Sequence, residues 1–187
     1  MSAILFHGAL VRLAAWDNAA AAEAIARWSL DSEYRRLEDS GPARPLLNRL
    51  LREKMEGSEP HGIALGFLIR TLADDRLIGA TDIAVTQWTH GDAFVGIGIG
   101  EPADRGKGYG TDAMQVMLRY AFHELNLHRV SLTVYEYNPR AIRSYQKAGF
   151  VVEGRARQRL NREGRRWDVL YMGILREEWE KGAGTGE

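Results

Sequence analysis

The stretch "EPADRGKGYGTDAM", residues 101–114, is the most informative part of the sequence because it joins a predicted strand to a predicted helix. Within it, Gly106, Gly108 and Gly110 stand at alternate positions behind Arg105. Glycine has no Cβ, so it adopts left-handed conformations at little cost and lets backbone N–H groups approach a ligand. A helix start adds unpaired N–H donors and the positive end of the helix dipole. The stretch therefore predicts a loop that binds an anion.

Regular elements flank this loop on both sides. The preceding residues, "AFVGIGIG" (93–100), are typical of a strand. Residues 108–125 predict a helix, because their apolar side chains recur at spacings of three and four. A strand is expected at 130–135, and "NPRAIRSYQKAGF" (138–150) then begins with an N-cap and a proline and closes with glycine, as helices do. The chain therefore predicts one strand–helix–strand crossover.

The segments farther from the loop predict two more helices and several antiparallel strands. The helices are expected from Asp17 to about Leu30 and from Pro45 to about Gly57. The second should face its leucines inward, and these are Leu46, Leu47, Leu50 and Leu51. Strands are expected at 10–13, in a meander at 62–72, 76–85 and 93–100, and in a terminal hairpin at 150–160 and 165–175.

This order of elements predicts an α/β (α+β) fold. The sheet should be mixed and mostly antiparallel, with about six to seven strands flanked by about four helices. Residues 1–181 are expected to form a single domain, and residues 182–187, "GAGTGE", a flexible C-terminal tail.

Composition limits the classes of partner. The chain has 187 residues, no cysteine and a formal net charge of zero, so neither a disulfide framework nor a global attraction to nucleic acid is expected. Its N-terminus lacks the features of a signal peptide, and no apolar run is long enough to span a membrane. We expect a cytoplasmic monomer or homodimer that does not bind membranes. The five histidines suggest no metal site, and they are His7, His61, His90, His123 and His128.

Two common phosphate-binding motifs do not fit the glycine loop. Five residues separate Gly100 from Gly106, and Lys107 precedes a glycine, so the Walker A spacing fails. A dinucleotide fingerprint fails as well, because Pro102 falls within it and the helix begins downstream. The remaining pattern is R-x-x-G-x-G at 105–110. Both this loop and the Asn138 cap follow neighbouring strands, where α/β sheets bind ligands.

With these two motifs, the chain resembles the GNAT acyl-CoA-dependent N-acetyltransferases, in particular the branch of the ribosomal-protein N-terminal acetyltransferases RimJ and RimL. The resemblance runs from "GALVRLAAW" (8–16) to "RRWDVLYMGILREEW" (165–179). It implies acetyl-CoA as cosubstrate, with no metal required. Asn138 would bind the amides of the pantetheine arm, and the strand residues Ile97, Gly98 and Ile99 would pair with this arm. The pyrophosphate would be bound by Arg105, Gly106, Lys107, Gly108, Tyr109 and Gly110.

The resemblance also implies a general acid, and Tyr145 matches its position. The alternative is that Tyr145 is only a core-facing aromatic side chain. The general base is open, because some relatives use a glutamate where this chain has Thr133. Glu101, directly after the strand expected to hold acetyl-CoA, is the principal candidate. Asp82 and Glu33 are alternatives.

The acceptor is expected to be a primary amine. Deprotonating an α-amine of pKa about 8 at pH 7 costs about 1.4 kcal/mol, against about 4.6 for a lysine-type amine of pKa about 10.4. A site without a dedicated base therefore favours the N-terminal α-amine of a protein or peptide. The alternatives are a small amine, such as an antibiotic, a polyamine or an amino-acid-like compound, and a noncatalytic acyl-CoA sensor.

Two charged segments bear on possible partners. The acidic stretch 31–39 can attract a cationic acceptor. The arginines of the terminal hairpin form either a solvated face or a surface for an acidic partner.

Overall fold

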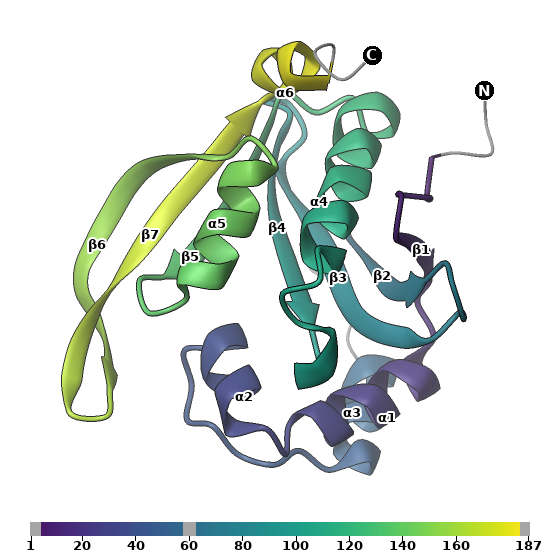
Figure 1. Ribbon diagram of the computed structural model, residues 1–187, viewed down its shortest axis with the longest axis vertical. Helices are drawn as coiled ribbons and strands as arrows, with labels where there is room; N and C mark the ends of the chain where they lie inside the picture. Colours follow the sequence, from purple (N-terminus) through teal and green to yellow (C-terminus); the bar gives the residue numbers. More distant parts are fainter. Residues whose placement is uncertain (1–4, 58–62, 184–187) are drawn as a thin grey trace.

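In a computed structural model, which describes residues 5–57 and 63–183, the protein folds around one seven-stranded sheet. The spatial order of its strands is β1-β2-β3-β4-β5-β7-β6 (Figure 1). The strands are β1 (Val11–Ala15), β2 (Ile63–Thr71), β3 (Leu77–Gln87), β4 (Asp92–Ile99), β5 (Arg129–Tyr135), β6 (Val151–Arg162) and β7 (Arg165–Leu175). All neighbouring strands are antiparallel except β4 and β5, so the predicted mixed sheet is confirmed.

The helices gather in two places. Figure 1 shows α4 and α5 in front of the sheet, whereas α1, α2 and α3 lie below it in this view. Their bounds are α1 (Asn18–Trp28), α2 (Ser32–Glu38), α3 (Asn48–Gly57), α4 (Tyr109–Arg119), α5 (Pro139–Lys147) and α6 (Arg176–Ala183). A short 3-10 helix, η1 (Pro102–Asp104), precedes α4, and a π-helical turn, η2 (Tyr120–Glu124), continues it.

The parallel pair β4–β5 determines where a ligand can enter the sheet. Among the described residues these strands pair only at Asp92 with Arg129, Ala93 with Val130 and Phe94 with Ser131. On its other side, β4 stays paired with β3 as far as Ile99. The second half of β4 therefore has one backbone edge that β5 does not cover, and the two strands diverge toward their carboxyl ends.

The main core lies between the sheet and α4. The apolar stripe predicted for this helix is fully buried at Met114, Met117 and Phe122. Asp112, in the first turn of α4, accepts hydrogen bonds from the backbone N–H groups of Ala9, Leu10 and Val11 at 2.7–2.9 Å. Because three N–H donors converge on one carboxylate, the start of α4 is tied to the segment that leads into β1.

The N-terminal helices differ in part from the prediction. The charged stretch 31–41 contains α2, capped by Asp31 and anchored by Tyr34, which is only 5% exposed. The helix expected from Pro45 begins at Asn48, and Leu47 and Leu50 are 65% and 51% exposed instead of facing inward. Periodicity alone marked these leucines as a core face, but in the structure the side chains of Leu47 and Leu50 face solvent.

The C-terminal segment also differs from the prediction. The last strand is followed by α6, so Gly182 and Ala183 of the predicted tail are helical. The rest of that tail, residues 184–187, lies outside the described residues. No helix in the described part of the chain is long and apolar enough to cross a membrane.

Candidate functional site

A cavity of about 370 Å³ occupies the space where β4 and β5 diverge. The start of α4, the length of α5 and the buried side of α2 form its other walls. It brings together nine residues singled out from the sequence, namely Ile97, Gly98, Ile99, Arg105, Gly106, Gly108, Gly110, Asn138 and Tyr145. The glycine loop and the α5 cap, about 30 positions apart in the chain, thus face one volume.

The glycine loop needs its glycines for conformation. Gly106 and Gly108 have φ values of +79° and +91°, a region that side chains with a Cβ disfavour. Gly108 is also the N-cap of α4 and offers no side chain to accept the first N–H groups of the helix. These donors and the positive end of the helix dipole are therefore available to an anion in the cavity.

The side chain of Arg105 braces this loop. It is 7% exposed, its guanidinium donates to the carbonyl oxygens of Ile99 at 3.2 Å and Gly100 at 2.5 Å, and it lies 2.7 Å from the Asp31 carboxylate. Its charged group also lies over the Tyr34 ring, 5.7 Å from the centroid. Arg105 thus links the end of β4 to α2, so its guanidinium is already engaged with the protein.

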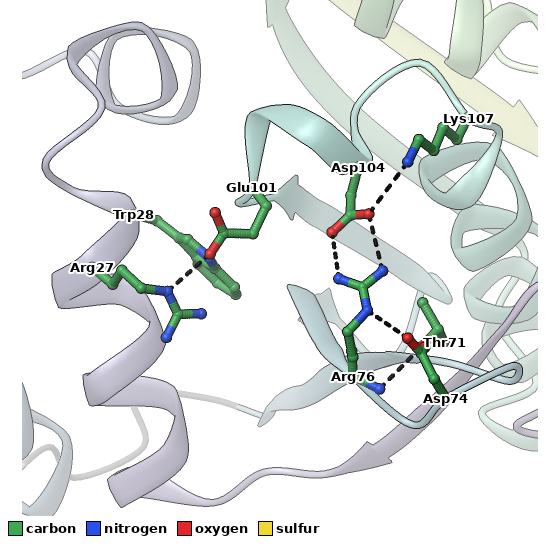
Figure 2. Close-up of polar contacts among 8 residues, drawn as sticks. All are labelled: Arg27, Trp28, Thr71, Asp74, Arg76, Glu101, Asp104 and Lys107. Carbon is green, nitrogen blue, oxygen red and sulfur yellow. Dashed lines mark hydrogen bonds and ion pairs between the residues drawn. The ribbon is translucent and has the colours of Figure 1, made fainter.

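Three predicted residues do not line this cavity. Glu101 and Lys107 line a second cavity of about 690 Å³ between α1 and the loop, and Tyr109 packs against the main core. Glu101 accepts hydrogen bonds from Arg27 Nε at 2.8 Å and from Trp28 Nε1 at 3.0 Å (Figure 2). Its position differs from that expected of a general base, because the chain turns after β4 and directs this carboxylate toward α1.

Asn138 and Tyr145 lie on the α5 side of the cavity. Asn138 caps the helix, its Oδ1 accepting from the Ala141 N–H at 3.1 Å. Tyr145 packs edge-on against Phe150, and burial raises the pKa of its hydroxyl to about 12. The hydroxyl therefore stays protonated at physiological pH, which suits a proton or hydrogen-bond donor and not a base.

Two carboxylates lie on the α2 side of the sheet. Glu38 lines the cavity from α2, and Asp82 lies on β3 beside the bare backbone of Gly96. Desolvation raises the pKa of Asp82, although water still reaches its side chain. Desolvation also raises the pKa of Glu38, with a smaller contribution from the negative charge of Asp82, while Arg35 opposes it.

Sequence reasoning weighed Asp82 but missed Glu38, because α2 was not expected. The available signal was the acidic stretch 31–39 itself. Glu33 is 65% exposed and lies within 4 Å of Arg105 and Arg140 at the surface. Thr133 lines the cavity, so this chain has a hydroxyl where some relatives were expected to have a glutamate. Within the described ranges, no group of three or more histidine, aspartate or glutamate side chains is arranged to hold a metal.

Comparison with known proteins agrees with this geometry. The family profile described as "Acetyltransferase (GNAT) domain" matches residues 11–151. The probable N-acetyltransferase YjcK of Bacillus subtilis is 35% identical over 131 residues, 70% of each chain. The putative ribosomal N-acetyltransferase YdaF of the same organism is 32% identical over 120 residues, 64% of this chain and 63% of that one.

A third relative is similar in sequence and in fold. The spermidine N(1)-acetyltransferase of Vibrio cholerae is 35% identical over 107 residues, 57% of this chain and 61% of that one. A crystal structure of spermidine N-acetyltransferase from that organism, in complex with CoA and spermine, superposes with a TM-score of 0.78 at 24% identity. This structural match covers 91% of this chain and 98% of that chain.

The family profile covers most of the chain, and the overall fold is that of the superposed acetyltransferase structure. The chain therefore belongs to the GNAT acetyltransferases, acyltransferases that use acetyl-CoA as the acetyl donor.

Proposed function

We propose that this protein transfers the acetyl group of acetyl-CoA directly to a small cationic amine, with the coenzyme bound in the cavity between β4 and β5. The observation that carries the proposal is the meeting of the glycine loop, the uncovered edge of β4 and Tyr145 in one volume. The pyrophosphate would accept hydrogen bonds from the loop and from the first turn of α4. The pantetheine arm would pair with residues 97–99 as an added strand.

Tyr145 fits the leaving-group side of this reaction. The neutral amine nitrogen forms a bond to the thioester carbon and gives up one proton to a base, the carbon–sulfur bond breaks, and the departing thiolate takes up a proton. A hydroxyl with a pKa of about 12 is a poor acid in water, so its contribution depends on its position beside the sulfur. It donates a hydrogen bond to the developing thiolate and supplies the proton as the sulfur leaves.

Glu38 and Asp82 fit the acceptor side. Their raised pKa values make them stronger bases than ordinary carboxylates, and their charges attract an ammonium group. An aliphatic amine of pKa about 10.4 needs such help, since its deprotonation at pH 7 costs about 4.6 kcal/mol. These carboxylates, together with the similarity to a spermidine acetyltransferase, support a polyamine or a related small amine as the acceptor.

A protein N-terminal α-amine is the second candidate, and with it the RimJ/RimL-like branch. Its support is the similarity to the putative ribosomal N-acetyltransferase YdaF. It would place fewer demands on the base, because the α-amine loses its proton near pH 8.

Turnover on matched acceptors separates the two candidates. The purified protein is incubated with acetyl-CoA and either spermidine or peptides with free N-termini, and free thiol and acetylated product are measured. We expect kcat/KM for spermidine to exceed that for every peptide by at least about tenfold, a difference of about 1.4 kcal/mol in transition-state binding. Faster peptide acetylation would favour the second candidate. If the protein binds CoA but acetylates none of these acceptors, both candidates are contradicted.

A further inference from the structure

Behind the glycine loop, Arg76 and Asp104 form an ion pair that has no role in the proposed reaction. Asp104 ends η1, directly before Arg105 and the glycines, and is 3% exposed. Two guanidinium nitrogens of Arg76 donate to its two carboxylate oxygens at 3.0 and 3.2 Å. Figure 2 shows the guanidinium directed at the loop from the turn between β2 and β3.

Arg76 is itself held in place. Its Nε donates to Asp74 at 2.7 Å, and its backbone N–H donates to the Thr71 hydroxyl at 3.0 Å. The Thr71 hydroxyl in turn donates to Asp74, and Thr71 is 1% exposed. A bidentate pair between a fixed guanidinium and a buried carboxylate specifies distance and orientation, so this turn determines where η1 ends.

Asp104 also lies between the two cavities and lines both of them. A carboxylate in the wall of a pyrophosphate site would repel the ligand if its charge were not neutralised. Arg76 supplies the close positive charge, while the Lys107 ammonium, 56% exposed, lies 3.8 Å away from the opposite side. Removing Arg76 would therefore leave this buried carboxylate beside the anion with only the more distant and more exposed Lys107 as its remaining described cationic partner.

We propose that Arg76 is a positioning residue for acetyl-CoA, which acts through Asp104 by holding the end of η1 and by neutralising its carboxylate where the pyrophosphate binds. This inference rests on the proposed role of the glycine loop. It predicts a defect in coenzyme binding and no defect in the chemical step, because Asp104 lines the cavity next to the glycine loop and Arg76 does not line it.

The test compares Arg76→Gln, Asp104→Asn and the double variant with wild type. CoA affinity is measured by calorimetry, and KM for acetyl-CoA and kcat are measured with saturating acceptor. For Arg76→Gln we expect Kd and KM to rise about tenfold, the effect of losing one charge-assisted contact of about 1.4 kcal/mol, with kcat within about twofold. Asp104→Asn should weaken CoA binding less, since it removes the charge that repels the pyrophosphate as well as the ion pair that holds the end of η1. The double variant should recover most of the Arg76→Gln loss.

Arg12→Gln is the matched control. Arg12, on β1, also donates through two guanidinium nitrogens, at 2.6 and 3.0 Å, but both donate to one oxygen of Asp75, an exposed residue of the same β2–β3 turn. It should lose stability without losing CoA affinity. If Arg76→Gln fails to fold, Arg76→Lys is measured in its place. Lysine keeps the positive charge but cannot donate two parallel hydrogen bonds to Asp104, so we expect the Kd for CoA to rise about threefold.

An Arg76→Gln protein that binds CoA like wild type would overturn the proposal, as would a double variant no better than Arg76→Gln. Equal weakening by Arg12→Gln would reduce Arg76 to a general stabiliser and overturn it too. Gly108→Val distinguishes these failures from a failure of the loop assignment, because unchanged CoA affinity in that variant alone would remove the pyrophosphate from the loop.

Discussion

The Trp28 indole N–H donates to the Glu101 carboxylate at 3.0 Å, which joins α1 to the residue that follows β4. The indole lies against the bare backbone of Gly100, where a Cβ would come within 2.0 Å of the ring. Arg27 donates to the same carboxylate oxygen at 2.8 Å. Glu101 is therefore a contact between elements on the far side of the loop, and the proposed base function passes to Glu38 and Asp82.

Glu101→Gln should leave the pH dependence of turnover unchanged. The amide oxygen can still accept from Trp28, and only the partly exposed pair with Arg27 is lost, an interaction of about 0–1 kcal/mol. We expect kcat within about twofold of wild type and a small drop in melting temperature. The measurement is a pH–rate profile at subsaturating acceptor, and loss in this variant of an acidic limb, where the wild-type rate rises as a carboxyl group loses its proton, would restore Glu101 as the base.

Gly108→Val should weaken CoA binding at least about tenfold, because the branched side chain opposes the left-handed backbone and blocks approach to the N–H groups. Gly164→Val is the control, since Gly164 also has a positive φ, +71°, with open space around it, in the distant β6–β7 turn. Calorimetry with CoA should separate the two variants while their melting temperatures fall by similar amounts. Equal CoA affinities of the two variants would contradict the proposal that the glycine loop binds the pyrophosphate.

Tyr145→Phe should lower kcat by roughly 10- to 1000-fold and leave CoA affinity and folding nearly intact, since only the oxygen is removed. Tyr120→Phe removes a hydroxyl of raised pKa that does not line the cavity and should be neutral for turnover. Tyr145→Ala should cost about 3 kcal/mol or more, because it leaves a cavity beside Phe150. Full activity of Tyr145→Phe, under conditions where chemistry limits turnover, would exclude the acid role.

Asp82→Asn should stabilise the free protein at neutral pH relative to wild type. The folded-state pKa of Asp82 is raised by desolvation, so its ionisation destabilises the fold as pH rises through that pKa. The advantage should disappear as pH falls below the unfolded value of about 3.9. Asp168→Asn should behave oppositely, because the Gln158 N–H and then Arg155 lower the pKa of Asp168. The measurement is the free energy of unfolding by denaturant, for both variants and wild type, between pH 4 and 8. If the two variants change in stability with pH in the same way, the raised pKa of Asp82 is wrong.

The site could be located from sequence because its main signals are local. A cap such as Asn138 acts on an N–H three residues away, and the apolar stripe of α4 repeats within each turn. The glycines of the loop likewise report a backbone conformation at their own positions. Such short-range patterns predicted the crossover, the mixed sheet and the face where the cavity lies.

From the sequence it was thus possible to predict the order of most elements, the position of the glycine loop and the helix that carries Tyr145. Which charged groups meet depends on the three-dimensional packing. Glu101 and Trp28 are 73 positions apart, and Arg76 and Asp104 are 28 apart. Contacts at such separations depend on how the sheet twists and where α1 and α2 pack, because a carboxylate can pair with any cation that the fold brings near. That is why Glu38 came into the cavity and Glu101 turned away from it.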